Sequence, residues 1–182
     1  WGTYLWGDST WGTARTVSEV TLDPGIWSLD NFGEVLVATI HNGKTFTWNA
    51  GATNPRTIRA STTTTNFQTT NNPTRSLMTL VSDRDRHLFH LGTETTIGNS
   101  GTQDPMFIRF SNQEDLNTYT PTATNTAGTF RLDAGSEIRA AVNAKDYTLV
   151  LTDRAAYVIQ FVGPPFTFSV RQVGTGCGCI GQ

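Results

Sequence analysis

Short runs of alternating apolar and polar residues, separated by polar turns, make up most of this sequence. The alternation predicts β-strands, because successive side chains of a strand point to opposite faces of a sheet. One of the turns contains Asn42-Gly43, the strongest two-residue signal for a β-hairpin. In the strand expected after it, Phe46 and Trp48 share one face and two threonines share the other.

The same strand-turn-strand pattern recurs along the first two thirds of the chain. It predicts turns at residues 30–33 and 82–86, and strands at residues 26–29, 34–40, 77–81, 87–91 and 106–110. Residues 136–144 also carry apolar positions with the spacing of a helix face, through Ile138, Ala141 and Val142. A strand is the preferred interpretation there, because the segment continues into the strand pattern that follows.

Residues 138–173 show the pattern most clearly, with four consecutive antiparallel strands expected at residues 138–142, 148–152, 156–162 and 166–173. In the third of these strands, Tyr157, Ile159 and Phe161 share one face, and Val158 and Val162 share the other. A strand that is apolar on both faces is expected to lie between two layers. We therefore expect Tyr157, Ile159 and Phe161 to be buried together.

Four-stranded antiparallel units that recur along a chain are typical of propeller blades. The sequence therefore predicts an all-β fold of antiparallel four-stranded blades, forming a partial or complete β-propeller. A β-sandwich explains the same hairpins and remains the alternative. At 182 residues, one β domain over residues 1–182 is expected.

Two segments are expected to lie outside the core. Residues 1–25 form a Trp/Gly-rich arm, in which Trp1, Trp6 and Trp11 each precede a glycine. Packing against a neighbouring subunit or blade is the preferred role for these rings, and carbohydrate stacking is the alternative. Residues 60–74 are rich in Thr and Asn, with Phe67 as the one large apolar side chain, and predict a long exposed loop.

Composition agrees with a β protein and gives little sign of a charged ligand. The 32 threonines suit half-exposed strands, and the apolar and charged contents are 37% and 15%. A formal net charge of -2 gives no overall attraction to nucleic acid or to an anionic membrane. No stretch approaches the roughly 20 apolar residues of a membrane helix, so no stable membrane insertion is expected.

The residues that could carry chemistry form no recognisable site. Asp83 and Asp85 share one turn and each precedes an arginine, which is usual for a charged hairpin tip. Asp104 and residues 112–115 resemble turn chemistry more than calcium ligands. The sequence predicts no catalytic residue, no cofactor-binding residue and no metal ligand, and hence no enzyme.

The histidine and cysteine residues also indicate no metal site and no catalytic site. His41, His87 and His90 lie near hairpin turns, and the last two are expected on opposite faces of one strand, unable to hold one metal together. Cys177 and Cys179 predict two reduced thiols in a Gly-rich terminal segment, which suits assembly in the bacterial cytoplasm.

Several structural motifs resemble those of β-propeller tail-nozzle and packaged-DNA stabilisation proteins of short-tailed bacteriophages. The resemblance extends over nearly the whole chain and rests on residues 11–15, 27–34, 108–113, 130–132, 135–136, 151–153 and 163–168. None of these motifs contains a catalytic residue. Such proteins are usually much longer, so 182 residues would form an incomplete propeller whose open edges need other partners.

The resemblance implies a virion structural protein of the phage tail: a nozzle, tube or neck component that assembles as a ring around the DNA exit channel. Its implied partners are copies of itself and other tail or neck proteins, with transient contact to passing phage DNA. The alternatives are a carbohydrate- or receptor-binding tail module and, with no support from the residues, a polysaccharide depolymerase.

Overall fold

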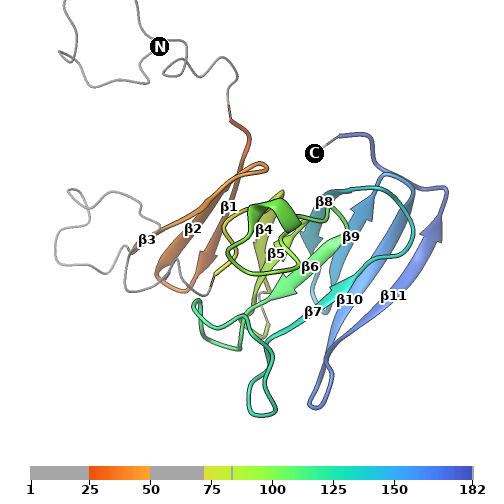
Figure 1. Cartoon of the computed structure of the whole chain (residues 1–182). Helices are drawn as coiled ribbons and strands as arrows, with labels where there is room; N and C mark the ends of the chain where they lie inside the picture. Colours follow the sequence, from red (N-terminus) through yellow and green to blue (C-terminus); the bar gives the residue numbers. More distant parts are fainter. Residues whose placement is uncertain (1–24, 50–71, 83, 182) are drawn as a thin grey trace, which may run out of the picture.

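The computed structural model describes residues 25–49, 72–82 and 84–181, and these residues form an all-β fold (Figure 1). A one-turn 3-10 helix, η2 (Ser100–Thr102), lies between two of the strands. No helix among the described residues is long and apolar enough to cross a membrane. The strands are β1 (Trp27–Phe32), β2 (Val35–Ile40), β3 (Thr45–Asn49), β4 (Met78–Val81), β5 (Leu88–Leu91), β6 (Phe107–Phe110), β7 (Gly128–Arg131), β8 (Ile138–Asn143), β9 (Thr148–Thr152), β10 (Ala155–Gly163) and β11 (Thr167–Thr175).

These strands form three antiparallel sheets, and in each sheet every strand pairs with its neighbour in sequence. The first sheet contains β1–β3, the middle sheet β4–β7 and the third sheet β8–β11. None of these three sheets closes on itself. Each is a simple meander, the strand order of a propeller blade.

The three sheets stack in chain order, from the orange β1–β3 sheet through the yellow-green middle sheet to the blue third sheet (Figure 1). Two clusters of buried side chains fill the spaces between them. Phe32 and Val37 of the first sheet pack with Val81 and Leu88 of the middle sheet. The middle sheet is therefore covered on both faces. A two-layer sandwich accounts for two of the sheets, and the third sheet in the same stack favours a partial propeller.

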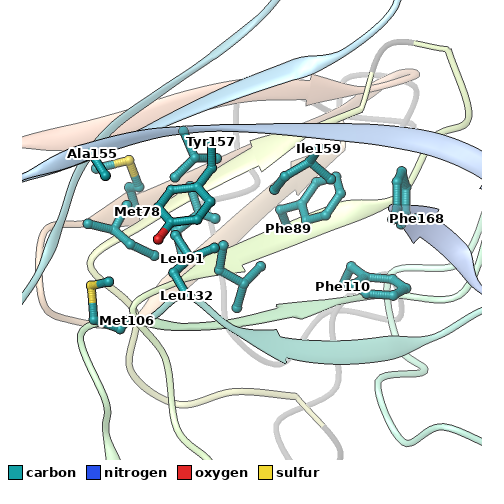
Figure 2. Packing of buried hydrophobic residues seen from close by; sticks show 13 residues of the cluster. Met78, Phe89, Leu91, Met106, Phe110, Leu132, Ala155, Tyr157, Ile159 and Phe168 are labelled. Carbon is teal, nitrogen blue, oxygen red and sulfur yellow. The ribbon is translucent and has the colours of Figure 1, made fainter. Parts of the chain in front are cut away.

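The larger cluster lies between the middle and third sheets and is rich in aromatic rings (Figure 2). The ring of Phe168 lies 4.9 Å from the rings of both Phe89 and Phe110, measured between centroids. Tyr157 and Ile159 project from β10 into the same layer. Offset and edge-to-face ring contacts of this kind stabilise a core beyond the area that they bury.

Most of the predicted strands are present in the structure. The hairpin at Asn42-Gly43 joins β2 to β3, and Asn42 takes the positive φ of the turn. Residues 138–173 fall within the third sheet, as predicted. The strand interpretation of residues 136–144 is also confirmed, because β8 occupies Ile138–Asn143.

Some predicted strand ends are wrong. Residues 30–32, for which the sequence predicts a turn, belong to β1 and pair with β2. The chain reverses instead at Gly33, whose φ of +67° suits glycine. Phe166 was placed in a strand, but it lies in the turn before β11 and is 78% exposed. Strand β7 was not predicted.

Two predictions about burial need correction. Strand β10 is not apolar and covered on both faces, because Val162 is 54% exposed and no described sheet covers that side. On its inner face, Tyr157 and Ile159 are buried, whereas Phe161 is only partly buried.

The loop predicted at residues 60–74 is not exposed at its end. Asn72 and Pro73 are buried, and Thr74 is half-buried and donates its backbone N–H to Glu94. The remainder of that loop, residues 60–71, lies outside the described residues. So do residues 1–24, which include nearly all of the predicted Trp/Gly-rich arm.

Candidate functional site

The first strands of the three sheets, β1, β4 and β8, each lie at the edge of their own sheet. Strand β1 packs beside β4, and residues of all three strands line one hollow. Two backbone N–H groups on the free edge of β4 are satisfied by β1 side chains. Thr79 N donates to Ser28 Oγ at 3.1 Å, and Val81 N donates to Asp30 Oδ2 at 2.7 Å. Side chains therefore hold the sheets together at an edge that would otherwise carry unpaired polar groups.

Strand β8 joins the same arrangement from the other side. Asn143 donates its side-chain N–H to Val81 O at 2.6 Å, so a single residue of β4 is bonded to both flanking sheets. In a propeller, the first strands of the blades line the central axis. We call the meeting place of β1, β4 and β8 the hub.

A hollow of about 330 Å³ opens at the hub. Its walls are mostly apolar, and they bring together residues from all three first strands and their flanking residues: Ile26, Trp27, Ser28, His41, Leu77, Met78, Arg139, Ala140 and Ala141. Arg139 is paired with Glu137 at 2.9 Å. Among the described residues, the lining of the hollow therefore holds one ion-paired cation and the His41 imidazole, but no carboxylate for acid-base chemistry.

A buried polar network lies on the middle-sheet face that is directed toward the first sheet. The imidazole of His90 is bonded to Ser76 Oγ at 2.8 Å through Nδ1, and to the Tyr119 hydroxyl at 3.2 Å through Nε2. All three residues are buried. Burial, with the nearby positive charge of Arg109, lowers the pKa of His90 to about 3. The Ser-His contact is therefore enclosed in protein, and the histidine is held in its neutral form.

The same network contains two buried side chains of opposite charge, Arg109 and Glu94. The Arg109 guanidinium donates to Thr95 O at 2.9 Å, and to the carbonyl oxygens of Glu94 and Tyr119 at 3.3 Å. The Glu94 carboxylate accepts N–H groups from Thr74 at 3.1 Å and Gly98 at 2.8 Å, and also the Thr74 hydroxyl. Burial lowers the pKa of Arg109, and Glu94 opposes that shift. Through these hydrogen bonds, Arg109 and Glu94 connect three loop segments to the sheet.

His87 lies on the opposite face of the middle sheet, as the sequence predicted. Its ring packs 5.0 Å from that of Phe168, and its Nε2 is bonded to Thr126 Oγ1 at 3.1 Å. Burial lowers the pKa of His87 to about 4. His87 and His90 therefore cannot bind one metal together. The described residues contain no group of three or more metal-ligating side chains.

Several of the carboxylates that the sequence offers as candidates bind groups in their own turns or on a neighbouring strand. Asp85 is buried, which raises its pKa, although the positive charge of Arg84 opposes the shift. Asp104 binds Arg131 at 2.6 Å and accepts the N–H of Met106 at 2.9 Å. Within residues 112–115, Asp115 accepts the hydroxyl of Thr118 at 2.5 Å. Asp83 lies outside the described residues.

The remaining candidates are placed as follows. Cys177 and Cys179 are free thiols, and the backbone N–H of Cys179 donates to Thr152 O at 3.0 Å. His41 borders the hub hollow. Trp1, Trp6 and Trp11 lie outside the described residues. None of these placements brings the predicted candidates together in one site.

Apart from His41 and His90, the residues of the hub and of the buried network were not candidates in the sequence. One signal was present: Arg109 interrupts an otherwise apolar strand, where a charge must be buried or paired. The partners of Arg109 come from loops and from residues far away in sequence, which periodicity does not reveal. Comparison with protein-family models found no match, and comparison with curated proteins found no significant match.

Proposed function

We propose that this chain is a structural protein of a bacteriophage tail, in the nozzle, tube or neck, and that it acts by assembling around the DNA exit channel. The observation that carries the proposal is the stack of three meander sheets with their first strands at one hub. That arrangement supports the propeller fold implied by the resemblance to tail-nozzle and packaged-DNA stabilisation proteins. Most of the segments that carry the resemblance lie on β1, β6, β7, β9 and the β10–β11 turn.

The use of the polar side chains supports a mechanical role. The buried histidines bind side-chain hydroxyl groups, and Arg109 and Glu94 bind backbone groups, so that these residues hold loops and sheets in place. A protein that must resist the pressure of packaged DNA needs such cross-connections between its layers. The slight negative charge also suits a channel through which DNA slides, since fixed cations would bind each phosphate.

The test is the location of the chain in the virus particle. Antibodies raised against the purified chain, coupled to gold, are applied to virions of the phage that encodes it. We expect label on the tail or neck, and loss of that label when free chain is added as competitor. Label confined to the capsid, or virions that carry no label although the antibody recognises the denatured particle protein, contradicts the proposal.

A further inference from the structure

The stack of sheets ends in two apolar faces that no described sheet covers. On the first sheet, the face directed away from the middle sheet carries Trp27 and Leu29, which are 48% and 64% exposed. The Phe46 ring lies beside Trp27, with centroids 5.8 Å apart. Leu29, Ala38 and Phe46 form one cross-strand row in the sheet register. We call this surface the aromatic face.

The other end of the stack is the face of the third sheet that is directed away from the middle sheet. Val142, Leu149 and Val158 stand side by side there on β8, β9 and β10. Val142 is 55% exposed, and the other two are half-buried. Val162 and Leu151 extend the surface along β10 and β9. We call this surface the aliphatic face.

We propose that the aliphatic face of one copy of this chain packs on the aromatic face of a second copy. This inference rests on the self-assembly part of the proposed function, and it names the surfaces that meet. The contact would continue a packing already present twice within the chain, where each sheet lies face to face on the next in sequence order. Large rings on one face and branched aliphatic side chains on the other complement each other in shape, as the Phe32 ring of the first sheet does with Val81 and Leu88 of the middle sheet.

The number of sheets indicates how the copies close. Propellers usually have about four to eight blades. Two copies carry six of the described sheets, which is within that range, whereas three copies carry nine. The contact joins unlike surfaces, so each copy contributes its aromatic face to one contact and its aliphatic face to the other. The closed unit is therefore a pair with two equivalent contacts around a shared hub, and tail rings would be built from such pairs through other surfaces.

Sedimentation velocity on the purified chain tests this contact. The wild-type protein should sediment as a dimer with twice the chain mass of 19.9 kDa. Leu29→Glu places a charge on the aromatic face and Val158→Glu places one on the aliphatic face. Each should raise the dimer dissociation constant by about 100-fold or more, because the contact would bury an unpaired carboxylate. Thr122→Glu, in an exposed loop, is the matched control and should remain dimeric.

Mixing the two variants identifies which faces meet. Leu29→Glu and Val158→Glu should be monomeric separately, but together they keep one intact contact and should form a weaker heterodimer. If the aromatic face bound a second aromatic face, only Leu29→Glu would dissociate the dimer, and that result overturns the proposal. A wild-type monomer at every concentration also overturns it, since the faces would then be covered within one chain.

Circular dichroism and thermal melting show whether each variant is folded, and the milder Leu29→Ser and Val158→Ser replace any variant that is not. The outcome is independent of the proposed function. Gold label on the tail with a monomeric chain refutes the contact alone. A dimer through these faces with no label on the tail refutes the tail function alone.

Discussion

At the scale of single residues, alternation predicted which side chains share a face but not how deeply each is buried. Tyr157, Ile159 and Phe161 project from the same face of β10, yet Phe161 lies near the end of the strand and is only partly covered. Phe89 and Phe168 come from two different sheets and meet at the centre of the core. How deeply a side chain is buried depends on the sheet that packs against it, and a local sequence pattern contains no information about that sheet.

The core therefore predicts a ranking of aromatic truncations. Phe89→Ala should lower the free energy of unfolding by about 3–5 kcal/mol, because Phe89 is fully buried and packs on Phe110 and Phe168. Phe161→Ala, the matched control, should cost clearly less because part of that ring is exposed. Urea titrations followed by circular dichroism measure both. Equal losses for the two variants contradict the packing described here.

The buried histidines predict a loss of stability in mild acid. The folded pKa of His90, about 3, lies below the ordinary value of 6.5, so the unfolded chain binds the proton first. The stability contributed by neutral His90 is complete above pH 6.5 and falls by about 1.4 kcal/mol for each pH unit below it. His87, with a pKa of about 4, acts in the same direction.

Urea titrations between pH 7 and pH 5 check this. In His90→Gln the decline should be shallower than in the wild type, because the titrating group is gone. Ser76→Ala removes the Nδ1 partner but keeps the imidazole, so it should lower stability and leave the pH slope in place. An unchanged slope in His90→Gln shows that His90 does not titrate in this way.

At the scale of elements, the hairpins could be predicted because turn residues and two-residue periodicity act locally. Strand β7 could not, because its partner β6 fixes it more than its own sequence does. Gly128 begins β7 where the ring of Phe110 lies directly over the backbone, and a Cβ there would come within 2.4 Å of that ring. In the sequence, a glycine at this position predicts a turn, whereas in the structure it allows a close contact within a strand.

The hub could not be predicted either, because its hydrogen bonds join β1, β4 and β8 across long stretches of sequence. It predicts that Asp30→Ala should destabilise the fold by about 1–3 kcal/mol, since Val81 N–H would lose its acceptor at a buried edge. Glu34→Ala, at an exposed position in the turn after β1, is the control and should change stability little. Hydrogen exchange should also show the Val81 amide exchanging faster in Asp30→Ala. Unchanged protection of that amide contradicts the role given to Asp30.

At the scale of the whole molecule, the sequence predicted antiparallel units but not how they stack. Most hairpins can be predicted from their own residues, whereas the order of the layers depends on which apolar faces pack together. Between the middle and third sheets the faces are complementary and buried, whereas the apolar faces at the two ends of the stack are not covered by any described sheet. That difference explains why Val162, predicted to be covered, is exposed.

The three sheets are proposed to be consecutive blades around a common hub, and a second copy is proposed to complete the ring. Electron cryo-microscopy of the purified protein, averaged into two-dimensional classes, tests this most directly. We expect a closed ring that contains the six described sheets of two copies, seen along the axis, with β1, β4 and β8 of both copies around the centre. Particles with only three stacked sheets, or with two copies joined through other surfaces, would contradict it.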